Sequence, residues 1–230
     1  MKPHSLHPWN VTPTEAREIQ ERFRNHVLQK NVARLRHIRH VAGVDVSIKN
    51  NRVIAAIVVL DFSSLEIIAS SIHRQPVRFP YVPGLLTFRE CPALLPAYEK
   101  IRVEPDLVLV DGQGIAHPRR FGLAAHLGVL LGKPTIGCAK SRLIGVYEEP
   151  HEEAGCYTDL FDGEELIGAV LRTRTNVKPL FISVGHKIEL PTALDLVLNC
   201  CRGYRLPEPT RLAHQSAGGL LPSPRARYET

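Results

Sequence analysis

Residues 105–118 of the chain read PDLVLVDGQGIAHP, an apolar run followed at once by an acid and two glycines. Leucine and valine fill positions 107–110, as is typical of a strand buried within a sheet. The strand then runs into Asp111. Because a buried carboxylate is costly to desolvate without a positive partner, one acid at a strand end raises the question of what neutralises it.

Three β-rich segments precede this strand, at roughly 41–48, 52–61 and 66–74. The polar turns KNN and FSS separate them, and connections this short predict antiparallel neighbours. Further upstream, TPTE at 12–15 is a capping box with proline at the first helical position. It predicts a helix of about five turns ahead of the three strands.

Helical and strand patterns alternate in the second half of the chain, and β-α-β alternation predicts parallel strands in one sheet. The expected elements are a helix near 87–101, the strand 107–111, a helix near 119–131, strands near 134–139, 165–173 and 179–185, and helices near 191–202 and 208–216. This order resembles the ribonuclease H-like fold, an α/β fold in which helices flank a mixed sheet. We expect a single domain at 1–217 and a flexible tail at 218–230.

The composition is typical of a soluble globular chain, with 44% hydrophobic and 23% charged residues in 230. The longest aliphatic run, VIAAIVVL at 53–60, is far shorter than the roughly 20 residues of a membrane helix, so no span is predicted. The N-terminal MKPHSLHPWNVTP lacks the apolar region of a secretory signal, and we expect a cytoplasmic protein and a monomer. A formal charge of +6 and a pI near 9.2 favour an anionic partner, although many basic proteins bind no nucleic acid.

The cysteines are odd in number and show no CxxC spacing. This pattern argues against a disulfide framework and against a structural zinc site. We expect free thiols in core positions at Cys91, Cys138, Cys156, Cys200 and Cys201.

A second acid, Asp45, lies within VAGVDVSI, where valine and isoleucine alternate around it as in a central strand. The first strand and the strand 107–111 are natural neighbours in a mixed sheet, so Asp45 and Asp111 are expected to converge. Adjacent carboxylates repel each other, and such a pair binds either a proton or a cation. Because Mg²⁺ prefers carboxylate oxygens, the pair predicts a metal site. The alternative for each aspartate alone is a strand-end or turn acid.

Two further residues are candidates for the same site. Glu90 follows RFPYVPGLLTFR at the expected helix start, where it would face the two aspartates. Alternatively, Thr87 and Glu90 form a capping box, and the glutamate only satisfies a backbone N–H. Lys140 follows the strand PTIGCA, so it either points into the same crevice to neutralise a phosphate or position water, or lies on the surface.

The glycines after Asp111 also suggest a dinucleotide-binding turn, but the spacing argues against it. The third glycine of GxGxxG would fall at position 117, which is histidine, and no acid follows about 20 residues later.

Several longer stretches resemble the endonuclease V family, the deoxyinosine 3′ endonucleases of DNA repair. They are VAGVDVS, PYVPGLLTFRE, PDLVLVDGQGIAHPRRFGLAAHLGV, CAKSRL and SVGH, over roughly residues 40–190, with weaker support from RLAHQ near the C-terminus. The resemblance implies a Mg²⁺-dependent enzyme, with Mn²⁺ as a substitute ion. Its partner would be DNA that contains deoxyinosine or other deaminated bases. It would cut the second phosphodiester bond 3′ to the lesion and leave 3′-hydroxyl and 5′-phosphate ends.

The resemblance also implies roles for individual residues. The catalytic residues would be Asp45, Glu90, Asp111, Lys140 and His214, with the three acids as the metal centre. The strand-separating wedge would be Pro80, Tyr81, Val82 and Pro83. The pocket for the altered base would be lined by Gly84, Leu85, Gly112, Gly114, His117, Gly122 and Leu143.

Two alternatives to this function stay open. One is an endoribonuclease specific for inosine in RNA, because contacts to the 2′-hydroxyl decide that choice and the sequence does not display them. The other is a ribonuclease H-like binding module without catalysis, which a missing acid would favour. None of the three acids is missing.

Overall fold

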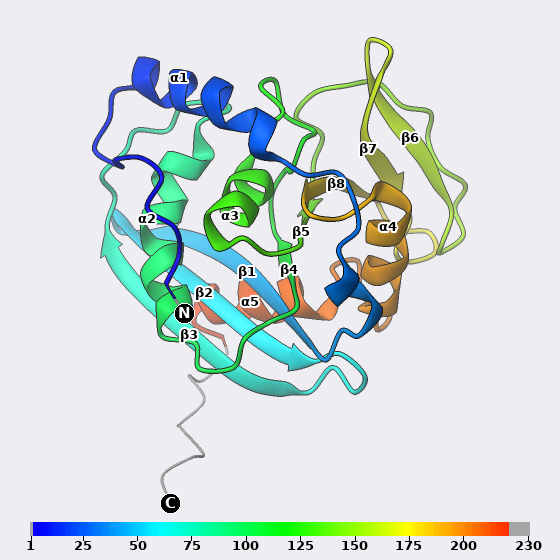
Figure 1. The fold of residues 1–230 in the computed structure, drawn as a ribbon. Coiled ribbons are helices and arrows are strands. Elements are labelled where there is room, and N and C mark those ends of the chain that lie inside the picture. The colour runs from blue at the N-terminus through cyan, green and yellow to red at the C-terminus, as the bar shows by residue number, and fades with distance from the viewer. Residues whose placement is uncertain (1, 221–230) are drawn as a thin grey trace, which may run out of the picture.

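One mixed sheet of eight strands runs through the molecule in the order β3-β2-β1-β4-β5-β8-β7-β6 (Figure 1). The computed structural model describes residues 2–220, so the predicted tail at 218–230 lies almost wholly outside the described residues. The strands are β1 His40–Lys49, β2 Arg52–Asp61, β3 Ile67–Pro76, β4 Leu107–Val110, β5 Thr135–Ala139, β6 Tyr157–Asp162, β7 Glu165–Leu171 and β8 Leu180–His186. The predicted mixed sheet, flanked by helices in one domain, is confirmed.

Helices cover both faces of this sheet. On one face, α2 Leu86–Glu99 and α3 Leu123–Leu131 pack against the strands, and α1 Pro13–Phe23 lies across both helices. On the other face lie α4 Leu190–Asn199 and α5 Glu208–Gly218. Two short 3-10 helices, Arg24–His26 and Ala33–Arg36, follow α1. No helix in the described part of the chain is long and apolar enough to cross a membrane.

The first three strands form antiparallel hairpins, as the short turns predict. Lys49 pairs with Arg52 across a two-residue turn. Asn50 and Asn51 in this turn have φ angles of 51° and 57°, the left-handed conformation that asparagine tolerates and that a type I′ turn needs.

β4 lies between β1 and β5 and is parallel to both. Val110, its last residue, pairs with Val44 of β1 and with Gly137 of β5. The residues that follow β4 and β5 therefore reach one edge of the sheet, beside the middle of the longer β1. This edge is where the ends of parallel strands place functional side chains.

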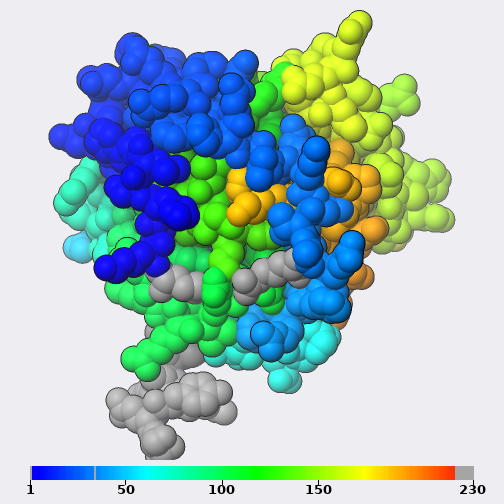
Figure 2. All heavy atoms as spheres, viewed as in Figure 1, coloured from blue at the N-terminus to red at the C-terminus, as the bar shows by residue number. Residues whose placement is uncertain are grey.

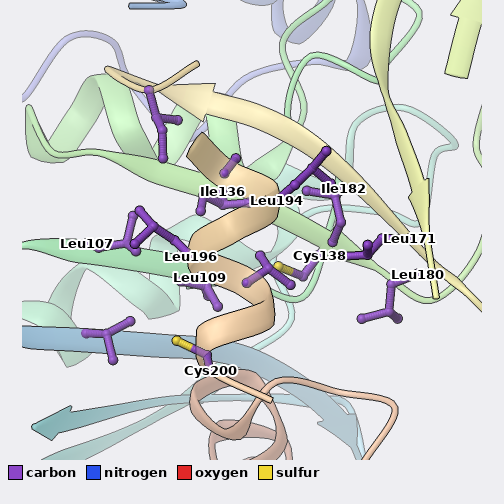
Figure 3. Packing of buried hydrophobic residues seen from close by; sticks show 14 of the residues in the cluster. Leu107, Leu109, Ile136, Cys138, Leu171, Leu180, Ile182, Leu194, Leu196 and Cys200 are labelled. Carbon is purple, nitrogen blue, oxygen red and sulfur yellow. The ribbon is translucent and has the colours of Figure 1, made fainter. Parts of the chain in front are cut away.

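Buried aliphatic side chains fix the strands that lead to this edge. Figure 3 shows side chains of β4, β5 and β8 packed against α4. Leu107 and Leu109 come from β4, Ile136 from β5, Ile182 from β8 and Leu194 from α4. Each is 4% exposed or less, and burial of one such side chain stabilises the fold by roughly 1.5–3 kcal/mol. The strands that lead to this edge are thus held by a well-filled core.

The first helix is shorter than the sequence predicts, although its capping box forms as expected. The Thr12 side chain accepts from the Glu15 N–H, and the Glu15 carboxylate accepts from the Thr12 N–H at 2.7 Å. The helix ends at Phe23 because the following segment bonds to the end of β8. The Leu28 N–H donates to His186 Nδ1 at 3.2 Å, and the Lys187 N–H donates to the Leu28 carbonyl.

One further strand and one further helix boundary differ from what the sequence pattern predicts. β6 was not predicted, because its sequence YTDLFD is largely exposed at the edge of the sheet. α3 begins at Leu123 rather than near 119, because the preceding residues form a loop in which Arg120 has a φ of 51°.

The N-terminal segment lies over α2 and α3 on the face shown in Figure 2. The His4 N–H donates to the Leu130 carbonyl at 2.8 Å. The His7 ring packs between aromatic rings, with its centroid 4.5 Å from that of Trp9 and 5.7 Å from that of Phe88. The segment therefore closes an aromatic cluster between α1, α2 and α3.

Candidate active site

Asp45 and Asp111 lie side by side at the edge where β4 ends. The parallel register pairs Val44 with Val110, and the Asp111 N–H donates to the Val44 carbonyl at 3.1 Å. The residues that follow this pair, Asp45 and Asp111, therefore point to the same face of the sheet. Each aspartate side chain is only 10% exposed. The predicted convergence of the two acids is confirmed.

α5 places His214 over Asp45. Its Nδ1 lies 2.7 Å from Asp45 Oδ2, a hydrogen bond in which the imidazole N–H donates to the carboxylate. Gly43 permits this close packing of α5 on β1, because a Cβ there would lie 1.9 Å from the Pro209 carbonyl oxygen. The imidazole side chain is 56% exposed, so its Nε2 edge is open to a substrate.

Lys140 follows β5 and turns into the same centre rather than lying away from it. Its Nζ donates to Asp111 Oδ2 and lies 3.5 Å from His214 Nδ1. The second contact is weak, because that nitrogen already donates to Asp45. With 37% of its side chain exposed, Lys140 has room to meet a substrate phosphate while it stays beside Asp111.

Glu90 approaches the aspartates from α2, on the opposite side of the sheet from α5. The helix begins at Leu86, and the N-cap residue Leu85 makes no side-chain capping bond. Glu90 therefore lies in the second turn, and the capping-box alternative for Thr87 and Glu90 is wrong. Burial of Leu85 in the cluster with α1 and α3 sets this helix start. Glu90 itself is 8% exposed.

The centre holds more negative charge than its neighbours balance. Burial raises the pKa of Asp45, and the adjacent Asp111 raises it further, whereas His214 and Lys140 partly offset these effects. Burial, Asp45 and Asp111 together raise the pKa of Glu90 well above its usual value. Three carboxyl groups in such surroundings favour the binding of a cation or a proton.

The donor atoms are arranged closely enough for a metal ion. Within residues 2–220, Asp45, Asp111 and His214 each offer one ligand atom, and these atoms lie within 4.8 Å of one another. The carboxylate oxygens of the two aspartates suit Mg²⁺ and Mn²⁺, whereas the Nδ1–H of His214 is engaged with Asp45. The residues present therefore fit a divalent cation.

A model of the endonuclease V family matches residues 20–215 of the chain. The endonuclease V of Methanothrix thermoacetophila is 52% identical over 214 residues, which are 93% of this chain and 94% of the relative. The chain belongs to the endonuclease V family. It is therefore an endonuclease, and the candidate acidic ligands agree with the metal dependence of that family.

Solved endonuclease V structures have the same fold. The enzyme of Streptomyces avermitilis superposes with a TM-score of 0.85 at 42% identity, covering 92% of this chain and 93% of the other. The Ciona intestinalis enzyme, in complex with a 24mer DNA containing an inosine followed by a ribo-adenosine, gives 0.79 at 28% identity, covering 90% and 96%. The chain thus shares its fold with these relatives over 92% and 90% of its length.

The predicted wedge, Pro80 to Pro83, projects from the loop between β3 and α2. Tyr81 is 71% exposed, and the Arg89 guanidinium lies 5.9 Å from its ring centroid. Buried Phe79 and Leu85 anchor the loop on both sides of it. The loop is held at its base and exposed at its tip, and its role as a wedge stays a prediction.

The Gly84 carbonyl joins this loop to the loop after β4. It accepts hydrogen bonds from His117 Nε2 at 2.9 Å, Arg119 Nη2 at 2.8 Å and Gln20 Nε2 at 3.1 Å. Burial lowers the pKa of His117 to about 4, so its ring is neutral and its Nδ1 accepts from the Arg119 N–H. His117 therefore fastens two loops that the sequence predicts to line the base pocket.

Most other predicted pocket residues have packing partners within the protein. A Cβ on Gly114 would lie 2.0 Å from the Val184 carbonyl oxygen, and one on Gly122 would lie 2.4 Å from that of Gln113. Gly112 is less confined, since a Cβ there would meet only the side chain of Leu123, with its Cδ2 at 3.2 Å and its Cβ at 3.3 Å. Leu85 is 1% exposed and Leu143 is 43% exposed. Base recognition by these residues stays a prediction.

Two residues that support the centre were missed in the sequence. Arg205 Nη2 donates to the Lys140 carbonyl at 2.6 Å and to the Pro179 carbonyl at 2.8 Å, which fixes the backbone that carries the lysine. Gln113 Nε2 donates to the Ser141 carbonyl at 2.9 Å. Gln113 stands within the DGQG motif, a signal that was available, whereas no local pattern marks Arg205.

Proposed function

We propose that this endonuclease recognises deoxyinosine in DNA and hydrolyses the second phosphodiester bond 3′ to it. The products would carry 3′-hydroxyl and 5′-phosphate ends, and other deaminated bases would be further substrates. The observation that carries the proposal is the convergence of Asp45 and Asp111 beneath Lys140 and His214. The Ciona intestinalis relative in complex with inosine-containing DNA supports the choice of base.

Asp45 and Asp111 would hold Mg²⁺, or Mn²⁺ in its place, with the carboxyl group of Glu90 adding negative charge beside them. When bound, the ion supplies Lewis-acid chemistry, which offsets charge on a phosphate oxygen and makes a water molecule more acidic. The acids lie close together and repel one another when ionised, so the centre is prepared for that added positive charge.

Lys140 and His214 have distinct roles in this proposal. The ammonium of Lys140 neutralises negative charge on the phosphate that lies against Asp111. His214 donates its Nδ1–H to Asp45, so its Nε2 lone pair faces solvent and accepts a proton from the attacking water. The water oxygen bonds to phosphorus while the bond to the 3′ oxygen breaks, and the leaving 3′ oxygen takes a proton from bulk water, which yields the 3′-hydroxyl and 5′-phosphate ends.

Tyr81 would enter the duplex and take the place of an extruded base. Pro80 and Pro83 restrict the backbone on both sides of the ring, and burial of Phe79 and Leu85 anchors the loop. A ring held this way offsets part of the unstacking cost, which is a few kcal/mol for an extruded base.

Inosine in RNA is the second candidate substrate. The Ciona intestinalis DNA carries a ribo-adenosine directly after the inosine, so that relative accommodates one ribonucleotide at this position. Only contacts to the 2′-hydroxyl separate the two substrates.

Cleavage of matched DNA and RNA strands, each with one inosine, tests the proposal. We expect cleavage of the DNA strand with Mg²⁺, none with EDTA, and none of a strand with adenosine in place of inosine. Preferential cleavage of the RNA strand would move the assignment to an endoribonuclease. Equal cleavage of inosine and adenosine strands would overturn it.

A further inference from the structure

We propose a second metal site, for Zn²⁺ or a similar borderline-soft divalent ion, formed by His151, Glu153 and Cys156. Each of these residues offers one ligand atom, and the three atoms lie within 4.8 Å of one another. In a tetrahedral zinc site, donors at the usual bond lengths lie roughly 3.5 Å apart, so small side-chain movements would close the site. All three residues come from the connection that leads into β6.

The connection is held in place by Arg172, the residue after β7. Its guanidinium is 8% exposed and donates to the carbonyls of Pro150 at 2.8 Å, His151 at 3.2 Å and Val177 at 2.7 Å. The Arg172 carbonyl accepts from the Gly155 N–H at 2.8 Å. Arg172 therefore fixes the backbone at both ends of the donor set before any ion binds, at His151 through its side chain and at Gly155 through its carbonyl.

The turn between Glu153 and Cys156 adds further order. The Cys156 N–H donates to the Glu153 carbonyl at 3.2 Å, and the Ala154 N–H donates to Thr175 Oγ1 at 3.1 Å. Within residues 2–220, no hydrogen bond or ion pair occupies the side chains of His151, Glu153 or Cys156. The donors are thus placed by the backbone and remain free to bind.

The chemistry of the donors selects the ion. A thiolate and an imidazole favour zinc over Mg²⁺, which prefers oxygen ligands only. His151 and Glu153 are exposed and Cys156 is half-buried, so a fourth position is open to water. Binding would release the thiol proton of Cys156. It would also stabilise the segment that leads into β6, at the open end of the β6–β7 hairpin. This hairpin projects from the molecule (Figures 1 and 2).

This site is separate from the acidic centre. Four strand spacings separate β4 from β6 in the sheet, which amounts to roughly 20 Å. The donors lack CxxC spacing, which is why the sequence argued against a zinc site. The pattern His-x-Glu-x-x-Cys does not by itself predict a metal site. Its three side chains come together only because the chain turns between Glu153 and Cys156.

Titration with Co²⁺ under reducing conditions tests the site, since a sulfur-to-cobalt charge-transfer band reports a bound thiolate and is not produced by the acidic centre. We expect this band to saturate at one Co²⁺ per chain and to be bleached by Zn²⁺. Cys156→Ser should abolish it, and His151→Gln or Glu153→Gln should weaken binding at least about tenfold. Cys201→Ser is the matched control, because Cys201 is the other half-buried thiol, and it should keep the band.

The Tm provides a second measurement that does not depend on cobalt. Zn²⁺ should raise the Tm of Asp111→Asn, which lacks an acid of the other centre, but not that of the double variant Asp111→Asn/Cys156→Ser. No charge-transfer band in the wild type, or a band that persists in Cys156→Ser, would overturn the proposal. A zinc-dependent Tm shift that the double variant Asp111→Asn/Cys156→Ser retains would do the same.

Discussion

Among single residues, Asp111 has the neighbours that most directly indicate a chemical role. It shares the sheet edge with Asp45 and accepts a hydrogen bond from Lys140. Asp111→Asn keeps the shape but removes the charge that would hold a cation. We expect cleavage of inosine-containing DNA to fall at least roughly a hundredfold while binding of that DNA persists.

The matched control is Asp195→Asn, since Asp195 is an exposed acid on α4. It should retain wild-type turnover in the same assay. Near-normal turnover of Asp111→Asn at saturating Mg²⁺ would show that the metal assignment is wrong.

Glu90 should show opposite effects on stability and on activity. Its raised pKa means that ionisation of this buried carboxyl group disfavours the folded state, and that cost declines as the pH falls below the folded-state pKa and vanishes below the ordinary pKa of glutamate. Glu90→Gln removes that charge, so we expect the free energy of unfolding in EDTA to rise by about 1 kcal/mol at pH 7. Cleavage should fall, because the centre loses part of its attraction for a cation.

Urea unfolding in EDTA, together with cleavage rates in Mg²⁺, measures both effects of Glu90→Gln. A loss of stability with full activity is the behaviour of a capping residue and would contradict a role in the centre.

The residues of the centre differed in how far the sequence could place them. Asp45 and Asp111 were predictable because each lies on or directly after one of two neighbouring parallel strands, and this arrangement brings both to one edge of the sheet. Glu90 was ambiguous, since its local pattern also fits a capping box and only the burial of Leu85 sets the helix start. Arg205 was not predictable, because its long side chain reaches Lys140 from a distant loop.

Among the elements, the loop after β4 tests how the base is read. Gly114→Ala would place a Cβ 2.0 Å from a carbonyl oxygen of β8, so loss of activity there reports damage to packing. Gly112→Ala meets only a leucine side chain at 3.2 Å and should fold. If backbone at Gly112 approaches the base, the alanine variant should lower the ratio of inosine to unmodified cleavage.

Cleavage of paired inosine and adenosine strands by folded Gly112→Ala gives this ratio. A ratio and an inosine rate that both match the wild type would remove Gly112 from base recognition.

The loop between β3 and α2 makes a different prediction. If Tyr81 replaces an extruded base, Tyr81→Ala should slow cleavage of duplex substrates more than cleavage of single strands, which need no unstacking. Tyr157→Ala is the control, because Tyr157 is also an exposed tyrosine, at 53%, but lies on β6. Equal losses on both substrates would make Tyr81 an ordinary contact residue.

Most strands and helices followed from the sequence pattern, including β3 at one edge of the sheet, but β6 at the other edge and the end of α1 did not. β6 carries a largely exposed sequence, YTDLFD, which lacks a regular alternation of polar and apolar residues, and it forms a strand by pairing with β7. α1 ends early because Leu28 bonds to the end of β8, a contact that no local signal announces. Tertiary contacts therefore override sequence propensity at the edges, as they commonly do.

In the molecule as a whole, buried histidines are distributed over several interfaces and are held neutral. Burial lowers the pKa of His7, His117, His126 and His186, to about 4 for His117 and His186. His7 and His126 share one hydrogen bond of 2.7 Å beneath the N-terminal segment. Protonation of these rings would break contacts between the segment, the loops and the sheet.

Acid should therefore destabilise this protein already at a pH well above the ordinary pKa of a carboxyl group. The unfolded chain takes up protons near pH 6.5, whereas folded His186 does so only at about 4, so stability present above pH 6.5 is lost as the pH falls toward 4. Each such histidine lowers the free energy of unfolding by about 1.4 kcal/mol per pH unit within that window. His186→Asn keeps an acceptor for the Leu28 N–H but cannot titrate. Urea unfolding at pH 7, 6 and 5 should thus show a shallower loss in this variant than in the wild type, and identical slopes would mean that His186 is not held neutral by the fold.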